Sequence, residues 1–158
     1  MPRAARYYKP REGLKIEEVP KPAIGENEVL LHVRAAGICH GDVILANGLG
    51  YPKSPMTPGH DFAGEVDEIG IGAKGKFERG DRVLVYSVGS CGACPNCLRG
   101  METRCLRRPL DSSYGMNTDG GLAEFCKVDA NRLIPLPKEI DWDFAATLGC
   151  AGLTATTQ

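Results

Sequence analysis

The sequence predicts a mainly β domain in which short strands are joined by tight turns. Its 158 residues include 20 glycines and 11 prolines, which are spread along the chain instead of being gathered in a linker. Glycine and proline end strands and form turns, so this spread favours many short strands. Two segments, 28–36 (EVLLHVRAA) and 62–69 (FAGEVDEI), alternate in part between apolar and polar residues, as half-buried strands do.

The individual elements are expected where apolar runs lie between Pro, Gly, Asn or Asp. In chain order the predicted strands are residues 14–19, 28–36, 62–69, 82–86, 121–128 and 132–134. Helical patterns are scarce: residues 39–47 (CHGDVILAN) and 141–148 (DWDFAATL) are the two candidates, the second with Asp141 as its N-cap. No internal repeat is present, and the length suits one domain over residues 1–158.

The charge balance argues against two classes of partner. The chain has 19 basic and 20 acidic residues without a long run of either sign, which disfavours nucleic acid and anionic membranes. No stretch approaches the ~20 apolar residues of a membrane span, and the N-terminus MPRAARYYKPREG has no apolar signal segment. We therefore expect a soluble, cytoplasmic protein, in which thiols stay reduced and clustered cysteines indicate metal.

Four of the seven cysteines lie close together in a CxxCxxC run with a fourth thiol after seven more residues. Zinc accepts four sulfur ligands at ~2.3 Å in a tetrahedral arrangement. Gly92, Pro95 and Gly100 allow the short loop between these thiols to double back on itself. The spacing predicts a structural zinc site, in a lobe at about residues 88–108, with the ligands Cys91, Cys94, Cys97 and Cys105.

Three other interpretations of this run fit less well. A redox CxxC pair normally stands alone at the start of a helix, whereas here two CxxC steps overlap. An iron–sulfur run of the ferredoxin kind has its fourth cysteine after three residues and before a proline, but Cys105 comes after seven and precedes Leu106. A disulfide knot needs an oxidising compartment, and the N-terminus has no apolar signal segment that would direct the chain to one.

Residues 70–75 (GIGAKG) match the GxGxxG pattern of dinucleotide-binding loops, but their context does not. That pattern binds a pyrophosphate because its glycine loop opens a helix, with an acidic residue about twenty positions further on. Here the chain leads through KFERGD directly into the predicted strand 82–86, and residues 82–101 contain no acidic side chain. We expect a hairpin-type turn, and no nucleotide-binding domain in this chain.

Two further neighbourhoods contain residues that could bind metal. GICHGD places Cys39 between a strand and a helix, where helix amides favour a thiolate, and PGHDFAG places His60 between a turn and a strand. Taken alone, an isolated histidine is more often a structural side chain, and an isolated cysteine a small buried apolar one. We therefore expect His32 to be a structural side chain and Cys126 to be a small buried packing residue.

The order of the motifs resembles the N-terminal catalytic domain of the medium-chain zinc-dependent alcohol dehydrogenases. The shared segments cover nearly the whole chain and comprise EVLLHVRAAGICHGD, TPGHDFAGEV, GDRVLVY, the four-cysteine lobe, DGGLAEF and ATLGCAGLTA. The resemblance implies an irregular, chaperonin-10-like β-barrel with few short helices. It also implies two zinc ions, one structural in the lobe and one catalytic on Cys39, His60 and Cys150.

By the same resemblance, the full-length protein is an enzyme that transfers hydride between a small-molecule alcohol and NAD or NADP, giving an aldehyde or ketone. Two thiolates and one imidazole leave the fourth zinc position open for that chemistry. Asp42 and Asp61 resemble carboxylates that orient ligands, and His40 resembles a basic residue that contacts the cofactor pyrophosphate. A homo-oligomer is implied as well. Tyr51 and Tyr86 correspond to substrate-pocket aromatics or to ordinary core residues.

Three departures from the family bear on mechanism. Gly41 and Ile44 stand where many members have a hydroxyl residue and a histidine that relay the alcohol proton, and neither can carry one. The carboxylate after the ligand histidine is Asp61 instead of the usual glutamate. The chain ends at Gln158, before the family's cofactor domain, so alone we expect it to be inactive. The alternative is a non-catalytic, zinc-stabilised binding or scaffold module.

Overall fold

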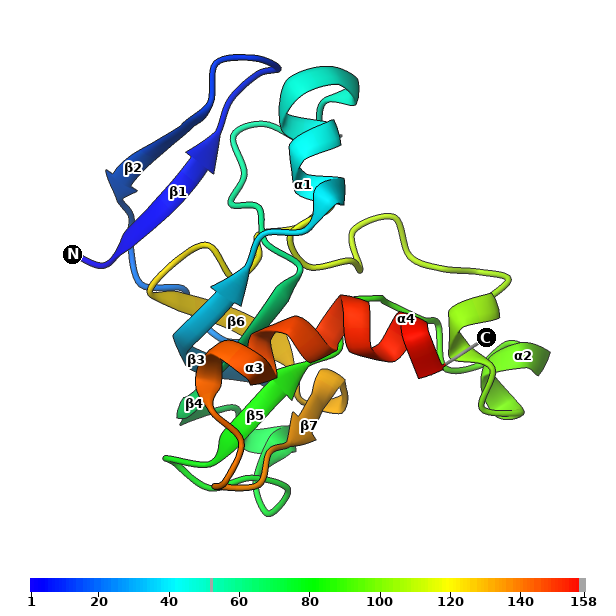
Figure 1. The fold of residues 1–158 in the computed structure, drawn as a ribbon. Helices are drawn as coiled ribbons and strands as arrows, with labels where there is room; N and C mark the ends of the chain where they lie inside the picture. The colour runs from blue at the N-terminus through cyan, green and yellow to red at the C-terminus, as the bar shows by residue number, and fades with distance from the viewer. Residues whose placement is uncertain (52, 157–158) are drawn as a thin grey trace.

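The computed structural model describes residues 1–51 and 53–156, whose strands form two antiparallel sheets (Figure 1). The small sheet is the hairpin of β1 (Arg3–Tyr7) and β2 (Leu14–Glu18). The larger sheet has the strand order β6-β3-β4-β5-β7. Its members are β3 (Glu28–Gly37), β4 (Asp61–Ile69), β5 (Arg82–Val85), β6 (Phe125–Asp129) and β7 (Leu133–Pro135).

The larger sheet curls into an irregular barrel. Its two edge strands, β6 and β7, are joined only by the 3₁₀ turn Ala130–Arg132, so the two edges must lie close together. Inward-facing residues of all five strands then form one apolar core, which includes Val29, Phe62, Val83, Val128 and Leu133. The sequence prediction of a mainly β, chaperonin-10-like barrel is confirmed.

Short helices lie at two places on this barrel. α1 (His40–Ile44) follows β3 and continues as a π-helical turn, Leu45–Leu49. α3 (Trp142–Thr147) continues through the π-helical turn Leu148–Gly152 into α4 (Leu153–Thr156). Buried Ala145 of α3 packs against Ala63 of β4 and Leu84 of β5. No helix in the described part of the chain is long and apolar enough to cross a membrane.

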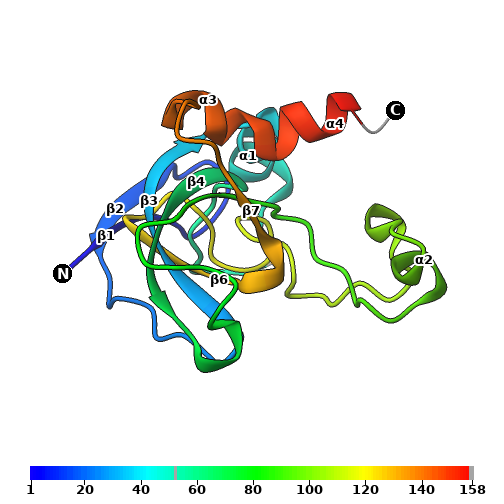
Figure 2. The ribbon, with the colours of Figure 1, turned by 90° about the horizontal axis from the view of Figure 1, so that it is seen from below.

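A lobe projects from the barrel between β5 and β6, as Figure 2 shows most clearly. It contains α2 (Pro95–Leu98) and the 3₁₀ turn Glu102–Arg104. The Arg132 guanidinium donates hydrogen bonds to the carbonyl oxygens of Val88 (2.8 Å) and Ser90 (3.2 Å). This side chain therefore ties the root of the lobe to the turn between β6 and β7.

Most of the predicted elements are confirmed, including both helices and the strands near 14–19, 28–36, 62–69, 82–86 and 132–134. The GIGAKG segment forms the 3₁₀ turn Ile71–Ala73 within the connection between antiparallel β4 and β5, as expected for a turn. The sequence does not predict strand β1 (RAARY). Only two of its five residues, Ala4 and Tyr7, are buried, and neither is a strongly apolar residue that would mark a strand.

The predicted strand 121–128 is wrong at its start, since β6 begins only at Phe125. The backbone of Gly121 and Leu122 donates instead to the carbonyl oxygens of Gly59 (2.8 Å) and Pro58 (3.0 Å). These residues are therefore paired with the turn that precedes His60, and they cannot extend the sheet.

The fold depends on Phe62, which is 0% exposed in the barrel core. We predict that Phe62→Ala lowers the free energy of unfolding of the zinc-saturated protein by about 3–5 kcal/mol, because it removes a buried ring and leaves a cavity. The control is Phe144→Ala, at a side chain that is 60% exposed and whose loss should change stability little. Equal losses in denaturant titrations of the two variants would contradict this description of the core.

Candidate metal centres

The lobe brings its four cysteines together as one cluster. Their sulfur atoms all lie within 4.8 Å of one another. The Cys94 and Cys97 sulfurs are 3.4 Å apart and those of Cys91 and Cys97 4.0 Å apart. A tetrahedral zinc with bonds of ~2.3 Å places its sulfurs about 3.8 Å apart, so the cluster has the size that zinc requires.

Disulfide pairing does not explain this cluster. Each of the seven cysteines, all of them in the described part of the chain, is a free thiol. Sulfur separations of 3.4 and 4.0 Å are far beyond the ~2.05 Å of a disulfide bond. The disulfide interpretation of the run is therefore wrong for this structure.

The local sequence of the lobe explains its geometry. Gly92 and Gly100 have φ values of +66° and +76°, which turn the chain sharply on either side of α2. Backbone N–H groups of Cys97 and Leu106 point at the Cys94 sulfur and lower its pKa to about 6, whereas burial raises the pKa of the Cys97 thiol to about 11. Backbone donors thus support negative charge within the lobe.

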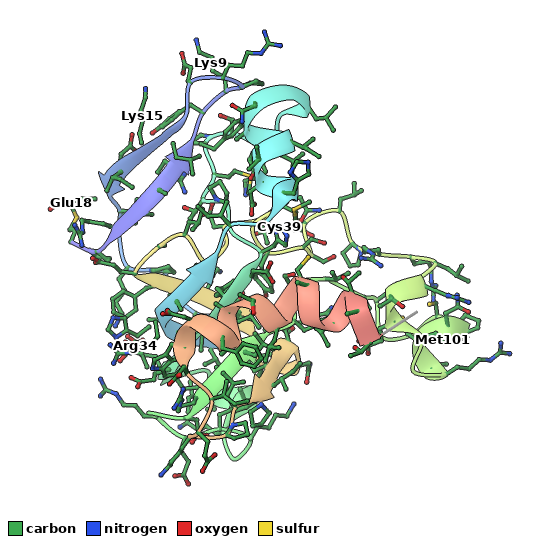
Figure 3. All side chains as sticks on the ribbon, viewed as in Figure 1. Lys9, Lys15, Glu18, Arg34, Cys39 and Met101 are labelled. Atoms are coloured by element: carbon green, nitrogen blue, oxygen red, sulfur yellow. The ribbon has the colours of Figure 1, made fainter. Side chains whose placement is uncertain are left out.

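A second cluster forms from three distant segments. Cys39 is the N-cap residue of α1, His60 directly precedes β4, and Cys150 lies in the helical turn after α3 (Figure 3 labels Cys39 at the lower end of α1). Together with Asp61, they place one donor atom each within 4.8 Å of the others. The Cys39 and Cys150 sulfurs are 3.9 Å apart, again close to the edge of a zinc tetrahedron.

Asp42 contacts two members of this cluster, His60 and Cys39. One carboxylate oxygen, Oδ1, makes an ion-pair contact of 3.3 Å with His60 Nδ1, without the geometry of a hydrogen bond, and accepts a hydrogen bond from the Tyr51 hydroxyl at 3.1 Å. The other oxygen accepts a bond of 3.0 Å from the backbone N–H of Cys39. A histidine with its Nδ1 held by a carboxylate presents Nε2 as the nitrogen for a metal. Asp42 therefore orients both His60 and Cys39.

The electrostatics of the second cluster follow from burial and from this pairing. The Asp42 carboxylate raises the pKa of His60 to about 9, although burial opposes the charge. Burial disfavours ionisation of Asp42, but His60 and the Cys39 N–H outweigh it and lower the pKa of Asp42. The Gly41 N–H lowers the pKa of the Cys39 thiol, and burial raises that of Cys150 to about 11.

Asp61 lies inside the cluster. It is 5% exposed, and its Oδ1 has no hydrogen-bond partner among the described residues. Burial raises the pKa of this carboxyl group. Gly149 leaves the room that Asp61 occupies, since a Cβ at that glycine would lie 3.2 Å from Oδ1. The sequence suggested an orienting carboxylate here, and the geometry makes Asp61 a candidate donor atom as well.

A clamp that the sequence analysis missed holds the turn before His60. The Asp119 carboxylate accepts hydrogen bonds from the Thr57 backbone N–H (2.8 Å) and from Arg6 (3.2 Å), which also donates to the Thr57 hydroxyl (3.0 Å). The Gly120 N–H donates to the Thr57 carbonyl oxygen at 2.8 Å. The sequence does not predict a role for Arg6, because Arg6 belongs to the unpredicted strand β1 and no sequence pattern links positions 6, 57 and 119.

The remaining residues singled out in the sequence have simpler surroundings. His40 is the exposed first residue of α1. Tyr51 is buried and packs edge-on against Tyr7, which makes it a core residue behind Asp42. His32 stacks on Phe125 at 4.9 Å between ring centroids, and Cys126 is buried in the barrel core, as expected. Tyr86 is half-buried and follows β5.

Comparison with known proteins places this geometry in a family. Residues 25–138 match the family model of the alcohol dehydrogenase GroES-like domain. An alcohol dehydrogenase of Geobacillus stearothermophilus is 37% identical over 147 residues, and an L-threonine 3-dehydrogenase of Shewanella sediminis is 35% identical over 148 residues. Each match covers 91% of this chain and 42% of the relative. The chain thus spans less than half the length of these relatives.

A solved structure shares the fold closely. A thermostable alcohol dehydrogenase of Pyrobaculum aerophilum, described with cobalt and zinc bound, superposes with a TM-score of 0.89 at 37% sequence identity. The match covers 98% of this chain and 46% of that one.

The contact between Asp42 and His60 can be tested in the metal-free protein. We predict that Asp42→Asn lowers the pKa of His60 from about 9 toward or below its ordinary 6.5, because burial then acts without the opposing charge. Since the folded pKa is raised, the pair stabilises the metal-free protein fully below pH 6.5 and loses that contribution as pH rises through about 9. NMR titration of the imidazole measures the shift.

The matched control for this titration is Asp143→Asn, which removes an exposed carboxylate of α3 and should leave the His60 pKa unchanged. A His60 pKa that is the same in wild type and Asp42→Asn would contradict the orienting role of Asp42.

Proposed function

The chain belongs to the family of alcohol dehydrogenases with a GroES-like domain, and from that premise we propose that it is the zinc-binding catalytic domain of an NAD- or NADP-dependent alcohol dehydrogenase. Residues 1–158 form this domain, with the structural zinc lobe at about 88–108. The full-length enzyme oxidises a small-molecule alcohol to an aldehyde or ketone, reversibly. The observation that carries the proposal is the convergence of Cys39, His60 and Cys150 on one point from three distant segments.

The donor sets of the two clusters suit different roles. Four thiolates on Cys91, Cys94, Cys97 and Cys105 would fill every position of a tetrahedral zinc, which fits a structural site. Two thiolates and an imidazole on Cys39, Cys150 and His60 would leave one position for substrate or for Asp61. A zinc ion held there would act as a Lewis acid, which would lower the pKa of an alcohol hydroxyl and favour release of hydride to a nicotinamide.

The protein groups around the second cluster have defined tasks in this proposal. Asp42 holds His60 in the tautomer that presents Nε2, through the 3.3 Å contact at Nδ1. The exposed His40, next to Cys39, is placed to contact the cofactor pyrophosphate. Gly41 and Ile44 cannot relay a proton, so the alcohol proton leaves by another group or by water.

Several finer points are part of the same proposal. The cofactor binds mainly to residues outside this domain, so the domain alone neither binds NAD or NADP tightly nor turns over substrate. The enzyme works in the cytoplasm as a homo-oligomer and has no nucleic-acid or membrane partner, which agrees with the net charge of -1.

Metal analysis tests the proposal directly. We predict close to two zinc ions per chain in the purified protein, one of which a chelator removes faster because its fourth position is open. His60→Ala should lose the faster zinc and Cys94→Ser the slower one, and Cys94→Ser should destabilise the fold more because structural zinc contributes to folding free energy.

The control for the metal analysis is Cys126→Ala, which removes a cysteine outside both clusters and should retain both ions. A single, slowly exchanging zinc that His60→Ala leaves in place would refute the catalytic site. It would instead favour a non-catalytic binding module.

The missing proton relay gives a second test, in the full-length enzyme. A Cβ at Gly41 would lie 3.6 Å from His60 Cε1 and 3.9 Å from the Cys39 sulfur, which is ordinary contact, so a serine fits and brings a hydroxyl to the cluster. Aligned acid–base groups contribute ~100-fold or more, so we predict that Gly41→Ser raises turnover of simple alcohols at least several-fold.

Gly48→Ser is the matched control for this variant, because a Cβ there meets nothing within 4 Å. Turnover measured with ethanol, 2-propanol and a diol distinguishes the outcomes. If Gly41→Ser leaves all three rates unchanged, ordered water already relays the proton.

A further inference from the structure

A cavity of about 380 Å³ lies between three segments of the chain, each of which is connected to the second cluster. One wall is Leu45, at the start of the turn after α1. Another wall is Ser87 and Val88, which follow β5. The third is the chain after the lobe, over residues 108–117. A volume of this size suits a small molecule.

Each wall continues from an element that contacts the second cluster. Leu45 follows α1, of which Cys39 is the N-cap. Gly115, which lies between the lining residues Ser113 and Met116, packs on the turn before His60, since a Cβ there would lie 2.6 Å from the His60 backbone nitrogen. Ser87 lies two residues after Val85, whose carbonyl oxygen would be 3.2 Å from a Cβ at Gly149, the neighbour of Cys150. Each wall of the cavity is therefore connected through the chain or through a backbone contact to a segment that carries a candidate ligand.

Four of the seven lining residues carry side-chain hydrogen-bond donors, set among apolar side chains. Ser87 and Ser113 contribute hydroxyl groups, and Asn117 contributes an amide. The Ser113 backbone N–H donates to Asn117 Oδ1 at 2.8 Å, which fixes that amide with its nitrogen as the donor for a ligand. A neutral alkyl alcohol would leave these groups without partners, whereas a ligand with acceptor oxygens would satisfy them.

Arg108 gives the cavity its charge. It is the only lining residue, among those described, with a formal charge at neutral pH, and no carboxylate lines this cavity. Its guanidinium donates a 2.8 Å hydrogen bond to the Thr103 carbonyl oxygen in the lobe. That bond anchors one nitrogen and leaves the other donors of the fork for a ligand. A guanidinium held in this way matches the oxygens of a carboxylate or a phosphate.

We propose that this cavity binds the far end of the substrate, and that the substrate is an alcohol carrying an anionic group that Arg108 recognises. The proposal rests on the dehydrogenase function proposed above. The hydroxyl carbon lies at the second cluster, and the carboxylate or phosphate lies at the mouth of the cavity, where Arg108 is exposed. The apolar side chains of Leu45, Val88 and Met116 also line the cavity, and they would contact the carbon chain that joins the two groups.

Binding to the zinc-loaded chain tests this assignment without relying on turnover. The probes are two matched pairs: 3-hydroxybutyrate with 1,3-butanediol, and glycerol 3-phosphate with glycerol. Ligand-observed NMR titrations should show that at least one anion binds about 10-fold or more tightly than its neutral partner, because a charge-assisted hydrogen bond is gained. Comparison of the two anions shows whether a carboxylate or a phosphate is recognised.

Variants assign the effect to one residue. Arg108→Gln should abolish the preference for the anion, Arg108→Lys should restore part of it, and Arg107→Gln, at the exposed neighbouring arginine, should leave it unchanged. Zinc content is measured for each variant, so that loss of the lobe is recognised. Equal affinity for both members of each pair, or equal weakening by Arg107→Gln and Arg108→Gln, would overturn the proposal.

Turnover by the full-length holoenzyme separates this inference from the proposed function. A lower KM for the anionic alcohol that rises in Arg108→Gln, with kcat nearly unchanged, supports both. If neither these probes nor ethanol and 2-propanol are oxidised with NAD or NADP while Arg108-dependent anion binding persists, the dehydrogenase proposal fails and the cavity remains an anion-binding site.

Discussion

The second cluster depends on a close backbone crossing between the turn that carries His60 and the loop that follows the lobe. A Cβ at Gly115 or Gly120 would lie 2.3 or 2.2 Å from the Gly59 carbonyl oxygen, so neither position has room for a side chain. Gly59 itself has a φ of +96°. The glycines thus let two segments meet at backbone contact, and the clamp of Asp119, Arg6 and Thr57 fixes their register. This crossing and the clamp together position His60.

Different interactions hold the candidate metal ligands close together in the two clusters. In the lobe, a short glycine-rich loop and backbone N–H groups gather four thiols that are near one another in sequence. In the second cluster, the distant donors are oriented by a buried ion pair, and an unpartnered carboxylate oxygen of Asp61 lies among them. Buried charge of this kind is costly unless a cation is nearby, which is a reason to expect a metal at this point.

The sequence predicted these features unequally. Cysteine spacing predicts the lobe because all its candidate ligands lie within one loop. The alternation of apolar and polar residues predicts strands such as 28–36. Cys39, His60 and Cys150 were united only by family resemblance, since no local pattern links positions 111 residues apart. The clamp at Asp119 and the place of Asp61 inside the cluster depend on tertiary contacts between β1, the His60 turn and the post-lobe loop, and local sequence does not encode such contacts.

Anomalous diffraction at the zinc absorption edge, from crystals of the protein, tests the central claim most directly. We predict two peaks, one between the four sulfurs of the lobe and one bounded by Cys39, His60 and Cys150, with His60 bound through Nε2. A lobe peak alone, with the Cys39 and Cys150 sulfurs still 3.9 Å apart and no density between them, would contradict it.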